Sequence, residues 1–354
     1  MTNNRVAIII ATKNRSEKLI ELLKYYVAIK SRHTIYIGDA SDSYHIKETV
    51  LTIKSLGNSI DIVYKQYPEY GRAQTDNAKT VEKMLEYVEE EYVVGSGDDD
   101  YFIPKSLDKC VDFLENNPNY SSAHGNGTFL TYNETKGKSI LGGRYILNGY
   151  KADSSSERLK MFCNSFSVLF FSVHRIKIFR KAYKNIEKLP LYPTLFEEIM
   201  PAFMSVILGN SKKLDCLYLI RGISPIRYKQ SKLMEKITDS GWSNSVEIFI
   251  NTLSEELRVI DGIDEMESKE IVKQAFIDYL EGSIERYYSN KDMVSLENIK
   301  KRVLNKFKQW IPVYVKKFII NSIPLNDYYD KSAQLSKASP YYFEFRSLLN
   351  NIKE

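Results

Sequence analysis

The first third of the chain alternates short apolar runs with segments in which apolar residues recur every three or four positions. "RVAIIIAT", "HTIYIGD", "IDIVYKQY" and "YVVGS" are apolar or β-branched runs typical of buried strands. "EKLIELLKYYVAI", after the first run, and residues 73–90, after the third, have helical spacing. Repeated strand and helix units of this length predict an α/β fold, with a mostly parallel sheet flanked by helices.

Further elements are predicted as far as residue 225. Pro104 suits the first turn of a helix, "YSSAHGNGTFLTY" and "KLDCLYLIRGISP" favour strands, and "LFEEIMPAFMSVILGN" favours a turn running into a helix. Glycine and serine in residues 137–156 predict a loop. From about Gln230 the pattern changes to long helical segments. We therefore predict a first domain at residues 1–229 and a helical C-terminal region at 230–354.

Polar residues follow three of the predicted strands. They are Thr12, Asn14 and Arg15 after the first, "GDASD" (Asp39–Asp42) after the second, and Asp98–Asp100 after the fourth. Because ligands bind beyond the carboxyl ends of parallel strands, we expect these side chains to converge. Three adjacent carboxylates repel one another, so they need either solvent or a counter-charge such as a divalent cation. The alternative is a solvated acidic turn that caps the next helix.

Composition narrows the class of protein. With 354 residues and 43% hydrophobic residues the chain can build a large core, and a net charge of +5 is too small to indicate a general nucleic-acid binder. Cys110, Cys163 and Cys216 lack metal-ligand spacing, which favours buried thiols in a reducing compartment. Neither a signal peptide nor a membrane span is predicted. We expect a cytoplasmic protein, at most peripheral on the inner face of the membrane.

Four motifs then suggest a family. "AIIIATKNR", "IYIGDASD", "YGRAQTDNAK" and "VVGSGDDDYFIP" occur in the order and approximate spacing of GT-A fold glycosyltransferases of the inverting family 2. The chain resembles above all the bacterial members that build surface polysaccharides such as capsule, over about residues 5–225. The resemblance implies a metal-dependent enzyme that moves a sugar, with inversion, from a nucleotide-sugar donor to a hydroxyl of a glycan or lipid-linked acceptor.

The resemblance also implies roles for individual residues. Asp98 would face the ribose, Asp99 would be structural or face the sugar, and Asp100 would bind Mn²⁺ or Mg²⁺ as the end of a DXD-type motif. The "GRAQTDNAK" segment keeps Gly71 and Asn77 of a family motif but has Asp76 where arginine is usual, which leaves Arg72 or Lys79 as the substitute. The nucleotide-binding residues implied in the first two motifs are Thr12, Asn14, Arg15 and Asp39, with Asp42 second to them.

The catalytic base is expected in "LFEEIMPAFM". An inverting transferase needs a base that deprotonates the acceptor hydroxyl, and the family places it in an acidic pair at the start of a helix. Glu197 and Glu198 are the candidates, with Glu198 preferred as the second of the pair. Two glutamates that merely favour a helix N-terminus are the alternative. His174 and Arg175 either face a phosphate or form structural hydrogen bonds.

Residues Ile299–Ile320 combine a stripe of large apolar side chains with intervening lysines, although Pro312 interrupts it. The pattern fits either an interfacial helix that meets a membrane or partner, or a core helix with a basic outer side. Two rivals to a transferase stay open: a sugar nucleotidyltransferase, and a non-catalytic carbohydrate-binding protein on the same fold. The first is disfavoured because no Gly-rich phosphate loop follows the first strand, and the second because the acidic motifs are retained.

Overall fold

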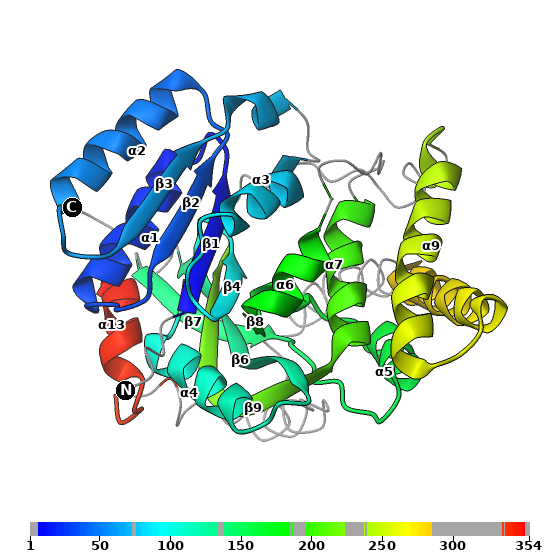
Figure 1. Cartoon of the computed structure of the whole chain (residues 1–354). Helices are drawn as coiled ribbons and strands as arrows, with labels where there is room; N and C mark the ends of the chain where they lie inside the picture. The colour runs from blue at the N-terminus through cyan, green and yellow to red at the C-terminus, as the bar shows by residue number, and fades with distance from the viewer. Residues whose placement is uncertain are drawn as a thin grey trace, which may run out of the picture.

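The computed structural model describes residues 6–72, 76–133, 138–184, 186, 195–223, 237, 239–284, 335 and 337–350. Its centre is a mixed sheet with the strand order β3-β2-β1-β4-β8-β6-β9-β5 (Figure 1). The first four strands run parallel to one another, as the sequence predicts. They are β1 (Val6–Thr12), β2 (Ile35–Asp39), β3 (Ile62–Gln66) and β4 (Tyr92–Ser96).

The second half of the sheet mixes strand directions. β8 runs antiparallel to β4 and β6, β9 runs parallel to β6, and β7 forms a hairpin with β6. β5 pairs antiparallel with β9, which places Asp100 opposite Arg221. The strands are β5 (Asp100–Phe102), β6 (Tyr120–Asn133), β7 (Lys138–Tyr145), β8 (Val173–Arg175) and β9 (Asn210–Gly222).

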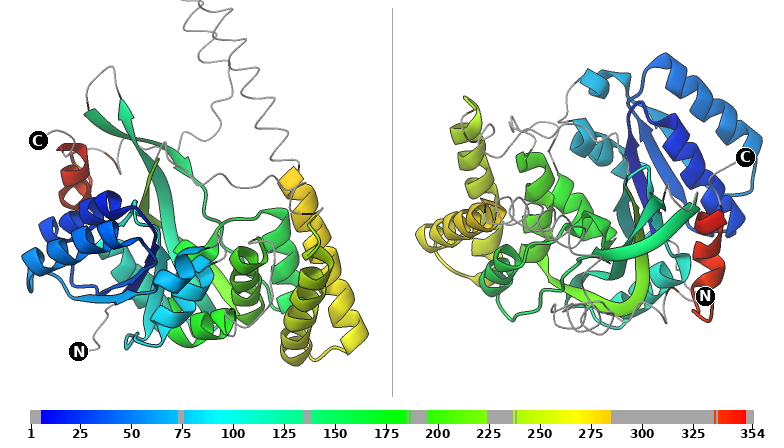
Figure 2. Two further views of the ribbon diagram at one scale, coloured as in Figure 1. Left: turned by 90° about the horizontal axis from the view of Figure 1, so that it is seen from above. Right: turned by 180° about the vertical axis from the view of Figure 1, so that it is seen from behind.

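Helices cover both faces of the sheet (Figures 1 and 2). One face carries α1 (Ser16–Ala28), α2 (Ser43–Leu56), α4 (Pro104–Glu115) and α13 (Tyr342–Asn350). The other carries α3 (Asp76–Leu85), α5 (Ser155–Asn164), α6 (Ile176–Tyr183), α7 (Leu195–Leu208), α9 (Trp242–Asp261) and a helix at residues 265–284. Two short 3-10 helices, η1 (Pro68–Arg72) and η3 (Leu169–Phe171), lie in the connections.

Alternation along β1 divides the interior into two cores. Val6, Ile8 and Ile10 belong to the cluster beneath α1 and α4, whereas Ala7 and Ile9 belong to the cluster beneath α3 and α7. All five side chains are fully buried. Removing an isoleucine side chain from water stabilises a fold by about 1.5–3 kcal/mol, so the two-sided burial fixes this strand at the centre of the sheet.

Three expectations about elements need correction. The loop predicted at 137–156 is wrong, because residues from Lys138 pair with β6 as β7 and α5 begins at Ser155. Gly143, with φ +71°, lies at an irregularity in the pairing of β7 with β6, where glycine adopts a conformation that other residues rarely do. The helix predicted at 73–90 is described only over α3, which ends at Leu85. α2 was not predicted; within it only Thr49 is buried, so its apolar stripe is weak.

The C-terminal region packs against the sheet-bearing part of the chain. Phe249 and Leu253 of α9 lie in the same apolar cluster as Phe203 of α7, and Phe345 of α13 lies in the cluster beneath α1. The boundary between 229 and 230 stays a prediction. Among the described residues, none of the helices has the length and hydropathy needed to cross a membrane. The basic segment 299–320 lies outside the described residues.

Candidate functional site

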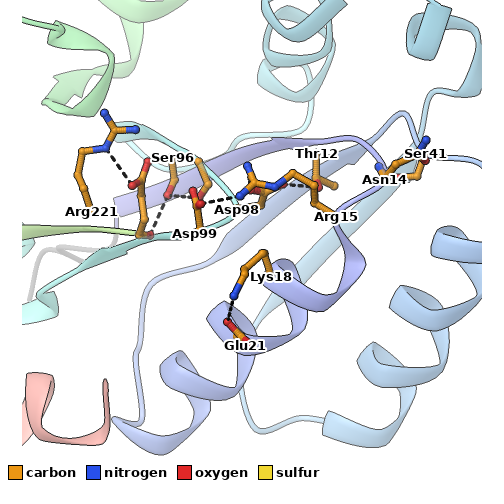
Figure 3. Close-up of polar contacts among 12 residues, drawn as sticks. Thr12, Asn14, Arg15, Lys18, Glu21, Ser41, Ser96, Asp98, Asp99 and Arg221 are labelled. Carbon is orange, nitrogen blue, oxygen red and sulfur yellow. Dashed lines mark hydrogen bonds and ion pairs between the residues drawn. The ribbon is translucent and has the colours of Figure 1, made fainter. Parts of the chain in front are cut away.

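The loop after β1 is organised by its own polar side chains (Figure 3). Asn14 adopts a left-handed φ of +53°, which asparagine tolerates better than most residues. Its backbone N–H donates to Ser41 Oγ at 2.7 Å, and its side chain exchanges two 2.8 Å hydrogen bonds with Asp42. Asn14 and Asp42 therefore tie the loops after β1 and β2 together.

Asp39 ends β2 and is fully buried. Its Oδ1 accepts from the backbone N–H of Ser41 at 2.9 Å, and its Oδ2 accepts from the hydroxyl of Tyr64 at 2.7 Å. Burial, followed by the bond to Asp39, raises the pKa of Tyr64, so the phenol stays protonated and donates. In this structure the carboxylate of Asp39 joins the loop after β2 to β3.

The three aspartates after β4 face two arginines (Figure 3). Arg15 lies 2.8 Å from Asp98 Oδ1 through Nη1 and 2.5 Å from Asp99 Oδ2 through Nη2. Arg221 lies 3.0 Å from Asp100 Oδ1 through Nε. The hydroxyl of Thr12 donates to Asp98 Oδ2 at 2.8 Å. The counter-charges that the sequence requires are thus present as guanidinium groups from β9 and from the loop after β1.

Burial distinguishes the three carboxylates. Asp98 and Asp100 are 3% and 1% exposed, whereas Asp99 is partly exposed. Burial raises the pKa of Asp98 to about 6 although Arg15 and Thr12 oppose the shift. Burial also raises the pKa of Asp100, against the effect of Arg221. Asp100 Oδ2 is buried and has no hydrogen-bond partner among the described residues, a costly state for a carboxylate oxygen.

A cavity of about 460 Å³ lies at the carboxyl ends of β1 and β4. Its volume is within the range of small-molecule sites. Apolar rings form much of its wall, among them Phe166, Phe170, Phe179 and Tyr279. The structure brings six of the predicted site residues to this one cavity: Arg15, Asn77, Asp99, Asp100, Glu197 and Glu198.

The acidic pair begins α7 and lines the cavity. Glu197 is 3% exposed, whereas Glu198 is exposed. The pair lies about a hundred residues after Asp99 and Asp100 in sequence but lines the same cavity. An exposed carboxylate at a cavity is accessible to a ligand that carries a hydroxyl group.

A divalent metal fits this site through Asp100. Among the described residues no group of three or more His, Cys, Asp and Glu side chains could hold a metal by itself. Mg²⁺, however, is usually held by one or two carboxylates together with substrate phosphates and water. The buried, unpartnered Asp100 Oδ2 at the cavity is a suitable first ligand.

Other predicted residues have different positions. Thr12, Asn14, Asp39 and Asp98 hold the loops and one another and are not among the residues that line the cavity. Gly71 and Arg72 lie in η1, which ends immediately before residues outside the described part.

His174 and Arg175 form structural hydrogen bonds. The imidazole Nε2 of His174 lies 2.8 Å from the carbonyl of Leu169. Arg175 donates to the carbonyls of Leu114 and Tyr120 at the end of α4 and the start of β6. Arg175 is thus structural within its described contacts, whereas His174 also lines the cavity, so both alternatives stay open for it.

Sequence reasoning missed Arg221 and the aromatic residues. Arg221 lies at the end of the apolar run "CLYLIR", so it carries the same signal, a charge after a buried strand, that identified the aspartates. Phe166, Phe170 and Phe171 belong to the apolar run "SFSVLFFSVHR" and line the cavity. The spacing of these phenylalanines in the sequence does not distinguish residues that line a cavity from residues of the apolar core.

Comparison with known proteins supports the fold. No protein-family model matches the chain, and no characterised protein matches it in sequence. S. aureus TarS 1–349 in complex with UDP-GlcNAc matches with 13% identity and a TM-score of 0.52, covering 78% of this chain and 73% of that one. TarS 1–349 alone matches with 13% identity and a TM-score of 0.50, covering 90% and 78%.

The chain spans 43% of the longer TarS structure, with a TM-score of 0.49 and 14% identity. At these identities the likeness concerns the fold. The α/β arrangement predicted from the sequence, a mostly parallel sheet between helical layers, is confirmed as a GT-A fold.

Proposed function

We propose that this chain is a nucleotide-sugar-dependent glycosyltransferase that transfers a sugar to a hydroxyl of a glycan or lipid-linked acceptor. The observation that carries the proposal is the single cavity that gathers Asp99, Asp100, Glu197 and Glu198. It is supported by the shared fold of TarS, whose 1–349 fragment forms a complex with UDP-GlcNAc. Membership of the inverting family 2 and a part in surface polysaccharide or capsule synthesis are further elements of the proposal.

Two groups of residues have different roles in the proposed reaction: the aspartates bind the donor, and the glutamates act on the acceptor. Asp100 would hold Mn²⁺ or Mg²⁺, which when bound supplies positive charge to the departing nucleoside diphosphate. Glu198 takes the proton of the acceptor hydroxyl while that oxygen attacks the anomeric carbon. The bond from this carbon to the diphosphate oxygen breaks as the new one forms on the opposite face, so the configuration inverts. Glu197, deeper in the wall, supports the same edge of the cavity.

Calorimetry tests the proposal. Wild-type protein titrated with UDP, GDP, CDP and dTDP should bind at least one of them more tightly when Mn²⁺ is present. A screen of donor hydrolysis over the corresponding nucleotide-sugars, and over CMP-sugars, then identifies the donor. Absence of metal-linked binding for all four nucleotides would remove the transferase proposal and favour the non-catalytic alternative.

A further inference from the structure

Arg221 brings a positive charge to the cavity from β9. It lies opposite Asp100 in the β5–β9 pair, and its Nε is 3.0 Å from Asp100 Oδ1. It lines the same cavity as Asp99 and Asp100, and 29% of its side chain is exposed. The pairing of β5 with β9 thus holds the Nε edge of the guanidinium against Asp100, while part of the Arg221 side chain stays accessible to a ligand.

Two aromatic rings lie against this guanidinium. Its central carbon lies 4.8 Å from the ring centroid of Tyr145 and 4.6 Å from that of Phe171. Cation–π contacts of this kind restrict the positions that the arginine side chain can adopt. Figure 3 shows the terminal nitrogens of Arg221 turned away from the carboxylate that Nε contacts. A pair of N–H groups presented in this way matches two oxygens of a phosphate.

The net charge of the aspartates and arginines at this site favours an anion only after a cation has bound. Asp98, Asp99 and Asp100 face Arg15 and Arg221, so three carboxylates meet two guanidinium groups and one negative charge remains. A divalent ion on Asp100 Oδ2 reverses the sign of this balance. The same ion also competes with Arg221 for the charge of one carboxylate, which weakens the ion pair between Arg221 and Asp100.

We propose, building on the donor site proposed above, that Arg221 is a diphosphate-binding residue that the metal releases. In the ligand-free protein Asp100 holds the guanidinium. Asp100 would hold the metal of a metal-bound nucleoside diphosphate, and Arg221 would then exchange Asp100 for the phosphate oxygens as its partner. Arg221 is then the group that distinguishes a diphosphate from a monophosphate.

The test compares wild type, Arg221→Gln and Arg221→Lys. Calorimetry with Mn²⁺ uses the nucleoside diphosphate that wild type binds best among UDP, GDP, CDP and dTDP, and its monophosphate. Arg221→Gln should weaken diphosphate binding by roughly tenfold or more, the usual effect of a charged hydrogen bond, and should change monophosphate binding much less. Arg221→Lys should recover part of the loss. Electron paramagnetic resonance should show tighter binding of Mn²⁺ alone to Arg221→Gln, since Asp100 loses its competitor.

The outcomes separate the two proposals. If wild type binds no nucleoside diphosphate, the proposed function fails. If wild type binds one but Arg221→Gln binds it equally well, or loses the monophosphate to the same extent, the role of Arg221 is overturned and the function stands. Should Arg221→Gln not fold, Asp100→Asn replaces it. This variant frees Arg221 and should bind the diphosphate without metal more tightly than metal-free wild type does, and no gain contradicts the inference.

Discussion

Each carboxylate after β4 has a different set of partners, although the three are consecutive in sequence. Within the described part of the chain, Asp98 is held by Thr12 and Arg15, Asp99 by Arg15, and Asp100 by Arg221 through one oxygen. Only Asp100 combines an unpartnered buried oxygen with a place on the cavity wall. The contacts therefore single out Asp100 as the metal ligand more sharply than its position in "DDD" does.

Asp100→Ala should abolish the metal-dependent part of nucleotide binding and leave the protein folded. Removal of the carboxylate costs the ion pair with Arg221 but also relieves repulsion from Asp99. Calorimetry with the preferred nucleoside diphosphate, with and without Mn²⁺, measures the effect. Asp108→Ala is the matched control, because Asp108 pairs with Arg32 away from the cavity. Retention of the full Mn²⁺ effect in Asp100→Ala would refute the assignment.

Glu198→Gln should lower turnover by about 10²- to 10⁴-fold, the usual contribution of general base catalysis, while donor affinity is preserved. Glu198 is exposed, so the variant should fold normally. Steady-state transfer and donor calorimetry together measure the two effects. Glu197→Gln is the comparison variant: a loss there alone moves the base by one position, and activity retained in both variants places the base elsewhere.

The sequence predicts the residues of this site better than their roles. Thr12, Asn14, Asp39 and Asp98 follow buried strands, and the shared geometry of strand ends is enough to group them. Whether such a side chain faces the cavity or a neighbouring loop depends on hydrogen bonds between segments far apart in sequence, such as that of Tyr64 with Asp39. The position of Arg221 opposite Asp100 depends on the pairing of β5 with β9, and no local sequence pattern encodes that pairing.

At the scale of elements, one carboxylate joins two helices. Asp261 at the end of α9 accepts hydrogen bonds from the backbone N–H of Ser155 at 2.8 Å and of Ser156 at 2.9 Å. These N–H groups lie in the first turn of α5, where helices leave donors unsatisfied and favour negative charge. Burial opposes the charge of Asp261, but hydrogen bonds from Ser156 and Ser155 outweigh it and lower its pKa.

Asp261→Ala should reduce the free energy of unfolding by about 1 kcal/mol at pH 7, the usual effect of losing a helix cap. Because the pKa of Asp261 is lowered in the folded state, this stabilisation is complete above the unfolded pKa near 4 and is lost as pH falls through the folded value. Urea unfolding at pH 7 and at pH 3 measures it. Glu247→Ala, on an exposed position of α9, is the control. If Asp261→Ala lowers the free energy of unfolding by the same amount at pH 7 and pH 3, the role of Asp261 as a charged cap is contradicted.

Helices and strands with a strong apolar periodicity are predicted well from the sequence. Strands that form only because a neighbouring strand supplies their hydrogen bonds are not. β1 and α1 are evident because their apolar spacing mirrors burial on one or both sides. β7 contains Gly142 and Gly143 and exists as a strand because β6 supplies its hydrogen bonds. α2 buries little, so its sequence need not carry an apolar stripe.

At the scale of the molecule, two histidines in the core link stability to acidity. Burial lowers the pKa of His124 to about 3 and that of His174 to about 4. The hydrogen bond from His174 to the carbonyl of Leu169 opposes this shift, and burial outweighs it. The unfolded chain takes up protons near pH 6.5, whereas the folded protein does not until the pH is much lower.

The two histidines should therefore lower stability as pH drops from 6.5 towards 4, by about 1–2 kcal/mol each at pH 5, whereas Asp98, whose pKa is raised to about 6, opposes the fall. Urea unfolding between pH 7 and pH 5 gives the slope. His174→Gln should flatten this slope whatever its own cost in stability. His45→Asn, at a half-exposed position, should leave the slope unchanged. An equal slope in wild type and His174→Gln would show that other groups cause the acid sensitivity.

The segment 299–320 is proposed as a peripheral membrane contact. Its lysines should draw the protein to anionic lipid by about 1 kcal/mol for each basic residue near the surface, and salt should weaken the attraction. Flotation with anionic vesicles at low and high salt measures this. Trp310→Glu combined with Phe307→Glu should release the protein without unfolding it. Failure of wild type to float at low salt would contradict the proposal and favour a soluble acceptor.

The last helix gives the chain a second attachment point. Glu344 of α13 accepts from the backbone N–H of Lys105 in the first turn of α4, and Tyr341 contacts Lys109 at 2.9 Å. The described chain therefore packs on one face of the sheet over residues 242–284 and on the other face at α13. The C-terminal part thus joins the two helical layers a second time, in addition to the sheet that lies between them.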